Sequence, residues 1–133
     1  MTIRSQLLHI TTESILAYAQ SIESPEQYIH DQLVAPVTMP ILFWRLFEPV
    51  HSLNTDEPLV HGYQHFAYQK PITAGMILQC ELSLLDVQQK IRPKHELTLF
   101  YYRLTGYEEE KLIFIADTTL IKIGDHNAKA DYS

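Results

Sequence analysis

The chain has 133 residues, of which 46% are hydrophobic and 20% are charged, with a formal net charge of −6. This length fits one domain with a single core. Its ten Lys and Arg residues are scattered along an acidic chain, so a basic surface for nucleic acid is not expected. The lone cysteine, Cys80, excludes an internal disulfide and a multi-thiolate zinc site. Because no signal peptide or membrane-spanning stretch is visible, a cytoplasmic protein is expected.

The first part of the chain predicts a short strand followed by a helix. Residues 6–10 fit a first strand, and residues 11–22 fit a helix capped by one of its two leading threonines. The expected buried face of that helix consists of Ile15, Tyr18, Ala19 and Ile22.

A second helix is predicted to be buried on all sides. Thr38 is a candidate cap, Pro40 suits a first turn, and Pro49 would end the helix. Residues 41–47 between them are apolar on nearly every side, which is typical of a helix wrapped by other elements.

The remainder of the chain changes to a period of two, which predicts strands. Four long strands are expected over residues 60–70, 76–87, 95–105 and 111–123. Turn residues separate them at 71–75, 90–94 and 106–110. We therefore predict one α+β domain over residues 1–124, a curved antiparallel sheet wrapped around the apolar helix (the hot-dog fold), with a polar tail at 125–133. A sandwich with both helices on one sheet face is the alternative.

One stretch of the predicted sheet carries a recognisable pattern. The residues concerned are His61, Gly62, Gln64, Phe66, Tyr68, Pro71, Gly75, Asp86 and Val87. They resemble the signature of MaoC-like dehydratases of the N-terminal, FAS1-like dehydratase type, H-G-x-Q-x-F-x-Y-x-x-P-x-x-x-G followed by a strand ending in D-V. Residues 34–40 are similar to the A-P-x-T segment of that family, and residues 18–22 to its Y-A-x-A-I. The likeness spans residues 8–124.

The resemblance implies a hot-dog domain of fatty acid metabolism that acts on (R)-3-hydroxyacyl or enoyl thioesters of CoA or acyl carrier protein, without a cofactor. Active relatives place an Asp, and a His five residues later, on a segment like G-D-x-N-P-L-H after the first helix. This pair performs general acid–base catalysis. Backbone N–H groups at the start of the buried helix polarise the thioester carbonyl. The resemblance also implies a homodimer, or a heterodimer with a catalytic hot-dog subunit.

This sequence departs from the family at the catalytic pair. Alignment on the first helix places the segment on residues 23–29, with Ser24 at the aspartate position and Ile29 at the histidine position. Isoleucine cannot transfer a proton. His30 lies one residue further along and is a candidate substitute, although the aspartate would still be missing. The resemblance therefore implies a non-catalytic or partner-dependent dehydratase subunit.

Three residues are candidates for contact with the acyl thioester. Pro36 has no N–H to donate, but the N–H of Val37 remains a candidate oxyanion donor. Thr38 follows it at the start of the buried helix, and Tyr63 belongs to a tyrosine-rich run that could line an acyl tunnel.

Other titratable residues give weaker hypotheses. Asp56 and His61 have the catalytic spacing of five, but they follow the buried helix, and Asp56 falls in a polar loop. His61 is therefore only a substitute candidate. The dispersed histidines do not predict a metal site. Cys80 lies on the apolar face of a strand and is expected to be a buried hydrophobe.

Two other functions remain open. One is a non-catalytic module that binds acyl thioesters or only dimerises. The other is an acyl-CoA thioesterase, because hot-dog thioesterases use a carboxylate to position water; Glu23 and Glu26 are the candidates for that role.

Overall fold

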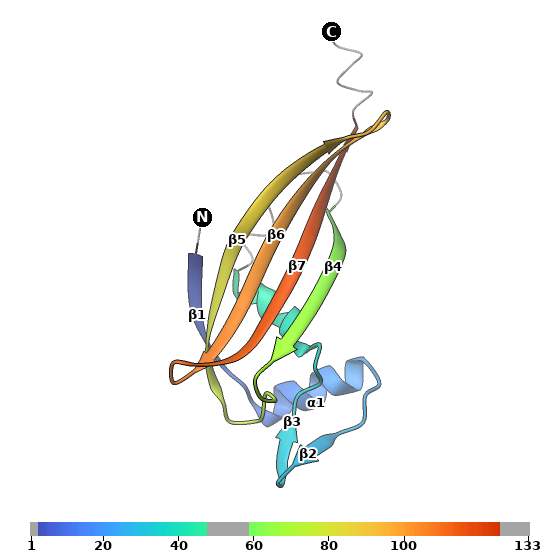
Figure 1. The fold of residues 1–133 in the computed structure, drawn as a ribbon. Helices are drawn as coiled ribbons and strands as arrows, with labels where there is room; N and C mark the ends of the chain where they lie inside the picture. The colour runs from blue at the N-terminus through green and yellow to red at the C-terminus, as the bar shows by residue number, and fades with distance from the viewer. Residues whose placement is uncertain (1–2, 48–58, 126–133) are drawn as a thin grey trace.

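The computed structural model describes residues 3–47 and 59–125, and its main feature is one long, curved antiparallel sheet (Figure 1). The strand order is β1-β5-β6-β7-β4, with β1 and β4 at the two edges. The bounds are β1 (Ile3–His9), β4 (Leu59–Tyr68), β5 (Ile77–Ile91), β6 (His95–Glu108) and β7 (Lys111–Asp125). The sheet contains the five predicted strands, and β5 and β6 are each longer than expected.

Helix α1 (Thr12–Ser21) follows β1 and begins as predicted. The Thr11 hydroxyl accepts the N–H of Ser14 at 3.0 Å, and the Ser14 hydroxyl accepts the N–H of Thr11 at 3.2 Å, which forms a capping box. Ile15, Tyr18 and Ala19 are buried as expected. The expectation for Ile22 was wrong: it is 45% exposed because α1 ends at Ser21 and Ile22 is its C-cap.

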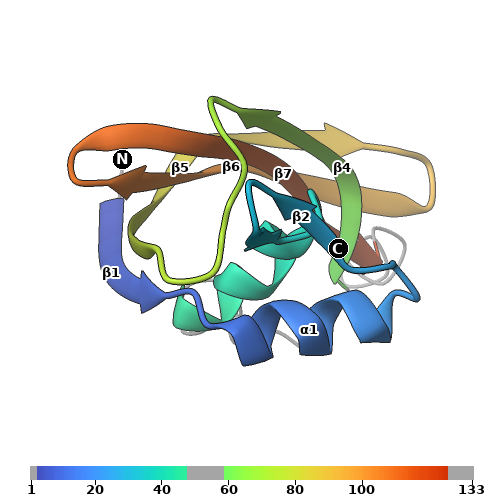
Figure 2. The ribbon, with the colours of Figure 1, turned by 90° about the horizontal axis from the view of Figure 1, so that it is seen from below.

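The apolar helix is present, but it is a 3₁₀ helix, η1 (Met39–Phe47). It lies between the concave face of the sheet and α1 (Figure 2). The Phe43 ring packs on Phe114 of β7, with centroids 5.8 Å apart, and Trp44 meets Tyr102 of β6 edge-on at 5.2 Å. The prediction that the sheet covers this helix is confirmed.

The core forms between η1 and the facing half of the sheet. Its most completely buried apolar side chains include Phe47, Leu78, Cys80, Leu104 and Phe114. Cys80 is fully buried, and burial raises the pKa of its thiol to about 12. The prediction of a buried hydrophobe at this position is therefore confirmed.

A small hairpin that was not predicted follows α1. It consists of β2 (Gln27–Ile29) and β3 (Gln32–Val34). His30 and Asp31 form its two-residue turn with φ values of 50° and 63°, the left-handed conformation of a type I′ turn. The pair His-Asp lacks the glycine of the usual type I′ turn pairs, such as Asn-Gly and Asp-Gly, so the sequence carries no strong turn signal here.

The arrangement is the hot-dog fold expected from the sequence pattern. Strand β7 continues through Asp125, one residue past the expected end of the domain, and the rest of the expected tail lies outside the described residues. Within residues 3–47 and 59–125, no helix has both the length and the apolar character needed to cross a membrane. A cytoplasmic location stays a prediction.

Candidate active site

Residues 35–38, which lead into η1, are held in place by main-chain hydrogen bonds to a neighbouring loop. The Ala35 N–H donates to the carbonyl of Ile72 at 2.8 Å, and the Ala74 N–H donates to the carbonyl of Leu33 at 3.1 Å. These bonds continue β3 alongside the loop that joins β4 to β5. The segment that leads into η1 is therefore anchored to the loop between β4 and β5 through main-chain atoms.

Two tyrosine hydroxyls clamp the same segment from either side. The hydroxyls of Tyr18 on α1 and Thr38 lie 2.6 Å apart, and the Tyr68 hydroxyl donates to the carbonyl of Val37 at 2.5 Å. Burial raises the pKa of Tyr68 above its ordinary value, with a smaller contribution from Tyr18, so this phenol stays neutral and donates. Thr38 lies directly before η1, as predicted for a cap, and its carbonyl accepts the N–H of Ile41 at 3.0 Å, while its hydroxyl pairs with Tyr18.

Two main-chain donors before η1, the N–H groups of Val37 and Thr38, have no acceptor among the described residues. Val37 is 65% exposed. Pro36 before it has no N–H to offer. Unpaired N–H groups at a helix start attract negative charge, which is the property that an oxyanion donor requires.

The aspartate position lies directly after the C-terminal cap of α1. Glu23 adopts φ 56° and donates its N–H to the carbonyl of Gln20 at 3.1 Å, while the Ser24 N–H donates to the carbonyl of Ala19 at 2.8 Å. This is a Schellman motif, in which the left-handed position usually holds glycine. The family segment quoted above has glycine in the same place, immediately before its aspartate. The cap geometry therefore fits the alignment that puts Ser24 at the aspartate position.

The histidine position and its candidate substitute lie on the hairpin. Ile29 ends β2 and is 46% exposed, and His30 lies exposed in the turn beyond it. Of the carboxylates proposed for a thioesterase, Glu23 directly follows the C-cap residue of α1, and Glu26 accepts a hydrogen bond from the Tyr28 hydroxyl at 2.7 Å. Both glutamates are exposed.

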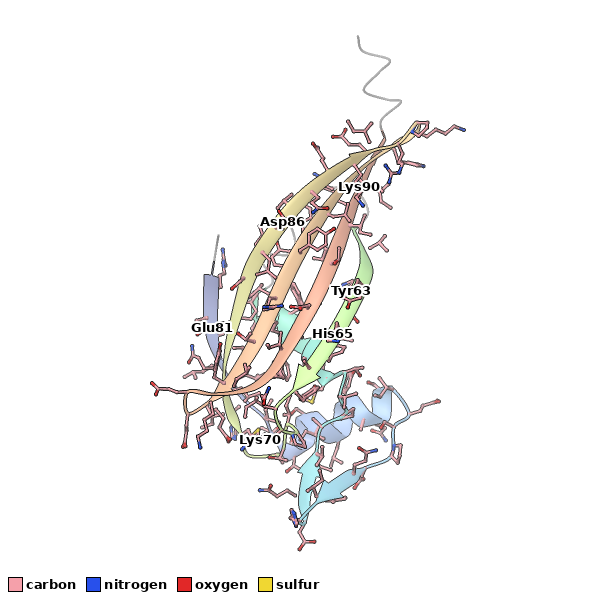
Figure 3. The ribbon with its side chains drawn as sticks, viewed as in Figure 1. Tyr63, His65, Lys70, Glu81, Asp86 and Lys90 are labelled. Atoms are coloured by element: carbon pink, nitrogen blue, oxygen red, sulfur yellow. The ribbon has the colours of Figure 1, made fainter. Side chains whose placement is uncertain are left out.

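The two candidates on β4 lie far from this corner. His61 and Tyr68 are seven positions apart on β4, roughly 23 Å at the usual rise per residue. The His61 ring pairs with the Gln64 amide, Nδ1 to Nε2, at 3.1 Å. Tyr63 is 57% exposed and stacks on His65 with the centroids 6.4 Å apart; Figure 3 shows both well away from Lys70, just beyond the other end of β4.

The structure thus divides the predicted site residues into two groups. Ser24, Ile29, His30, Val37 and Thr38 belong to one end of the molecule, around α1, the hairpin and the start of η1 (Figure 2). His61 and Tyr63 lie on the opposite arm of the sheet, and Asp56 is outside the described residues.

Sequence reasoning missed the two clamping tyrosines as parts of this site. Tyr68 follows Phe66 by two positions, so strand alternation already placed both on the face toward the helix. Nothing in the sequence indicated that its hydroxyl would reach the carbonyl of Val37, a contact between residues 31 positions apart. In the part of the chain that the structure describes, no group of three His, Cys, Asp or Glu side chains could hold a metal ion.

Comparison with known proteins identifies similar sequences and similar structures. The UPF0336 protein of Tropheryma whipplei (strain Twist) is 29% identical over 85 residues, which cover 53% of this chain and 61% of that protein. The crystal structure of the C-terminally truncated HadBC (3R-hydroxyacyl-ACP dehydratase) complex from Mycobacterium tuberculosis matches with a TM-score of 0.73 at 19% identity, over 90% of this chain and 94% of that one. A structure described as a MaoC-like dehydratase matches with a TM-score of 0.71 at 14% identity, over 90% of this chain and 41% of that one.

At these identities the two solved structures establish a shared fold and nothing beyond it. The match to a protein family is more specific: residues 2–112 fit the family described as "FAS1-like, dehydratase domain region". That range includes α1 with its cap, the hairpin, η1 and the β4 signature. The chain belongs to the FAS1-like dehydratase domain region family.

Proposed function

We propose that this chain is a subunit of an (R)-3-hydroxyacyl-thioester dehydratase or enoyl hydratase that depends on a catalytic hot-dog partner. The proposal rests on the alignment that places Ser24 and Ile29 at the catalytic positions of the family. Neither side chain titrates near neutral pH, so neither can exchange protons with the α-carbon or the 3-hydroxyl. The main-chain cap at Glu23 supports the assignment of these two positions.

The retained features suit a role in binding the acyl thioester. The exposed N–H of Val37 would donate to the thioester carbonyl, while Tyr18 and Tyr68 hold the segment that carries it. Such a subunit contributes carbonyl polarisation and one wall of the acyl site, and the partner contributes the acid–base pair.

The edge strand β4 is the proposed joining surface. It pairs with β7 on one side, and no described strand covers its other side. A long unpaired edge is a template for another strand, so a second hot-dog sheet would extend this one across β4. The similarity to the HadBC complex supports a partner that is a different chain, and a copy of this chain is the alternative.

The direct test is hydration of crotonyl-CoA, followed by the loss of enoyl-thioester absorbance. The purified chain alone is expected to show no turnover. Addition of a hot-dog protein that carries the D-x-N-P-[LIV]-H segment should produce turnover above that of the partner alone. Turnover by this chain alone that disappears in His30→Ala or His61→Ala would refute the proposal, because a displaced residue would then supply the chemistry.

A gain-of-function variant also tests whether residues 24 and 29 occupy the catalytic positions. Ser24→Asp combined with Ile29→His restores the pair that the resemblance implies. Hydration by the double variant, with none by either single variant, is the expected result. Ile29 is 46% exposed, so the imidazole should be accommodated without repacking the core.

The same assays separate the alternative functions. Saturable binding of acyl-CoA with no turnover, even with the partner, would mark a binding module instead. Release of free CoA thiol that is lost in Glu23→Gln or Glu26→Gln would mark a thioesterase.

A further inference from the structure

A hollow of about 420 Å³ lies on the outer face of the sheet, the face turned away from η1. Register places Thr119 of β7 directly between Tyr63 of β4 and Tyr101 of β6. Figure 3 labels Tyr63 on β4 and Asp86 on β5, the strands on either side of the hollow. Both residues lie on the near face of the sheet. The side chains that line it include Tyr63, Leu85, Leu99, Tyr101, Thr119 and Ile121.

Two β-bulges produce this hollow in a sheet that would otherwise be smooth. The register shifts at Gly62 in β4 and at Leu85 in β5, and both bulged residues line the hollow. Bulges bend the strand and increase its twist, so a pair of them on opposite flanks makes the face between them concave. A Cβ on Gly62 would lie 2.5 Å from Cδ1 of Ile121, so glycine is what allows Ile121 to form this wall.

The walls are held in position by contacts of their own. The Tyr101 hydroxyl donates to the Gln88 side chain at 3.3 Å, and the Tyr63 ring lies parallel to His65 with an interplanar angle of 3°. Both aromatic walls therefore have partners that fix them without a ligand.

The floor carries a polar group that lacks a partner. Thr119 is only 7% exposed, and its hydroxyl makes no hydrogen bond with any described residue. Buried hydroxyls are normally paired, because leaving one unpaired loses its interaction with water without replacement. An occupant of the hollow with one hydrogen-bonding atom over Thr119 would supply the missing partner.

The charges around the hollow restrict the kind of occupant. No Lys, Arg or His side chain of the described residues lines it, and the carboxylate of Asp117 does. Arg103 binds that carboxylate through two hydrogen bonds, of 2.8 and 3.0 Å, so its charge is already balanced. An anionic ligand such as a carboxylate or phosphate would find no positively charged side chain in the lining. A cationic ligand would find only the carboxylate of Asp117, which is already paired with Arg103.

We propose that this hollow binds a small uncharged cyclic compound that carries one hydroxyl or carbonyl group. The volume falls within the range of small-molecule sites, and a mainly apolar, aromatic lining with one or two polar groups is their usual composition. The site lies on the opposite face of the sheet from η1 and does not depend on the proposed dehydratase role.

The proposal is tested by titrating the full chain, with its Leu and Ile methyl groups ¹³C-labelled, with 4-propylphenol. Saturable shifts are expected at the methyls of Leu85, Leu99 and Ile121. The anion 4-propylbenzoate, with the same ring and tail, should bind at least about fivefold more weakly because no cation faces it. Equal binding of the two probes, or no saturable shift at these methyls, would overturn the proposal.

Variants then assign the contacts. Thr119→Val removes the hydroxyl at nearly constant shape and should weaken binding of the phenol about fivefold, while Thr119→Ser should retain it. Tyr63→Ala removes a wall and should also weaken binding. Tyr28→Ala is its matched control, since Tyr28 is 58% exposed, against 57% for Tyr63, and lies on the hairpin. Unchanged affinity in both Thr119→Val and Tyr63→Ala would show that the probe binds elsewhere.

Discussion

The two ends of the long sheet differ sharply in how they are packed. The covered half, which faces η1, comprises residues 64–68, 77–84, 102–108 and 111–118, and the distal arm comprises residues 59–60, 88–91, 95–99 and 121–125. In the covered half, Leu78, Cys80 and Leu104 have no exposed surface. In the distal arm no described side chain is buried, and Ile91 is 62% exposed.

The comparison teaches that the sheet is longer than the core it supports. The same three strands, β5, β6 and β7, run through both regions as an antiparallel ladder, with register shifts between Leu84 and Asp86 and between Gly106 and Tyr107. The two regions differ because η1 and β1 cover or flank only the covered half. Strand β1 pairs with β5 only as far as Ser83. The bulges at Gly62 and Leu85 lie at the boundary, so the change of packing coincides with a change of twist.

The largest expected effect comes from truncating one leucine in each region of β6. Leu104→Ala should lower the free energy of unfolding by about 2–5 kcal/mol, because it leaves a cavity in the covered half. Leu97→Ala, the same truncation in the half-buried distal arm, should cost less than about 1 kcal/mol. Urea unfolding followed by circular dichroism measures both, and equal costs would break the comparison.

Two glycines that face bulky side chains give the next largest contrast. A Cβ on Gly106 would lie 2.1 Å from the ring of the fully buried Phe114, which cannot move aside, so Gly106→Ala should cost about 1–3 kcal/mol. In Gly62→Ala the clash is with the end of the half-buried Ile121 side chain, which can rotate. Thermal unfolding should place Gly62→Ala near the wild type; a loss as large as that of Gly106→Ala would mean that the boundary is packed as tightly as the core.

The pH dependence of stability tests whether the Cys80 thiol is shielded from water in the covered half. Burial raises the pKa of Cys80 from 9.0 to about 12, so the unfolded chain loses this proton at lower pH than the folded chain. Its stabilising contribution is complete below about pH 9 and is lost as pH rises toward 12. Between pH 8 and pH 10 the wild type should therefore lose about 1 kcal/mol more stability than Cys80→Val.

Both proteins retain the tyrosines that titrate in the same range, so their contribution cancels in this difference. Identical pH dependence of the urea midpoint in the two proteins would indicate that the Cys80 thiol ionises freely in the folded chain.

The smallest expected effect is that of an ion pair on the outer face. Arg103 and Asp117 make two hydrogen bonds, but their side chains are 43% and 29% exposed. A double-mutant cycle with Arg103→Met and Asp117→Asn should give a coupling of about 0.5–1 kcal/mol that falls in high salt. The single contact between Lys70 and Glu108 should give less. A coupling of several kcal/mol would mean that the outer face is far less solvated than its exposure indicates.

Sequence periodicity was sufficient for the fold. The period of two identified the four long strands β4 to β7, and the apolar stretch at 41–47 identified the element that they enclose. The 3₁₀ geometry of η1 was not predictable, because an apolar run of nine residues carries no periodic signal that separates it from an α-helix. The β2–β3 hairpin was missed for a related reason, since its His-Asp turn lacks the usual residues.

The candidate site was predictable only where a backbone feature has a sequence signature. The resemblance to the family motif proposes Ser24 for the aspartate position, and its place directly after the left-handed Glu23 is compatible with that alignment. The contacts that shape the start of η1 were not predictable, because they join residues distant in the chain. The bond from Tyr68 to Val37 depends on how β4 approaches η1, a relation that tertiary packing alone determines.

The cap of α1 uses main-chain atoms alone, through the N–H groups of Glu23 and Ser24. The side chain at position 24 therefore contributes nothing to closing the helix, and the exposed one at position 29 contributes little to the core. Identity at both positions is free to change while the loop keeps its shape. Under the proposed function, two substitutions at these positions would remove or restore proton-transfer chemistry while the main-chain cap of α1 stays intact.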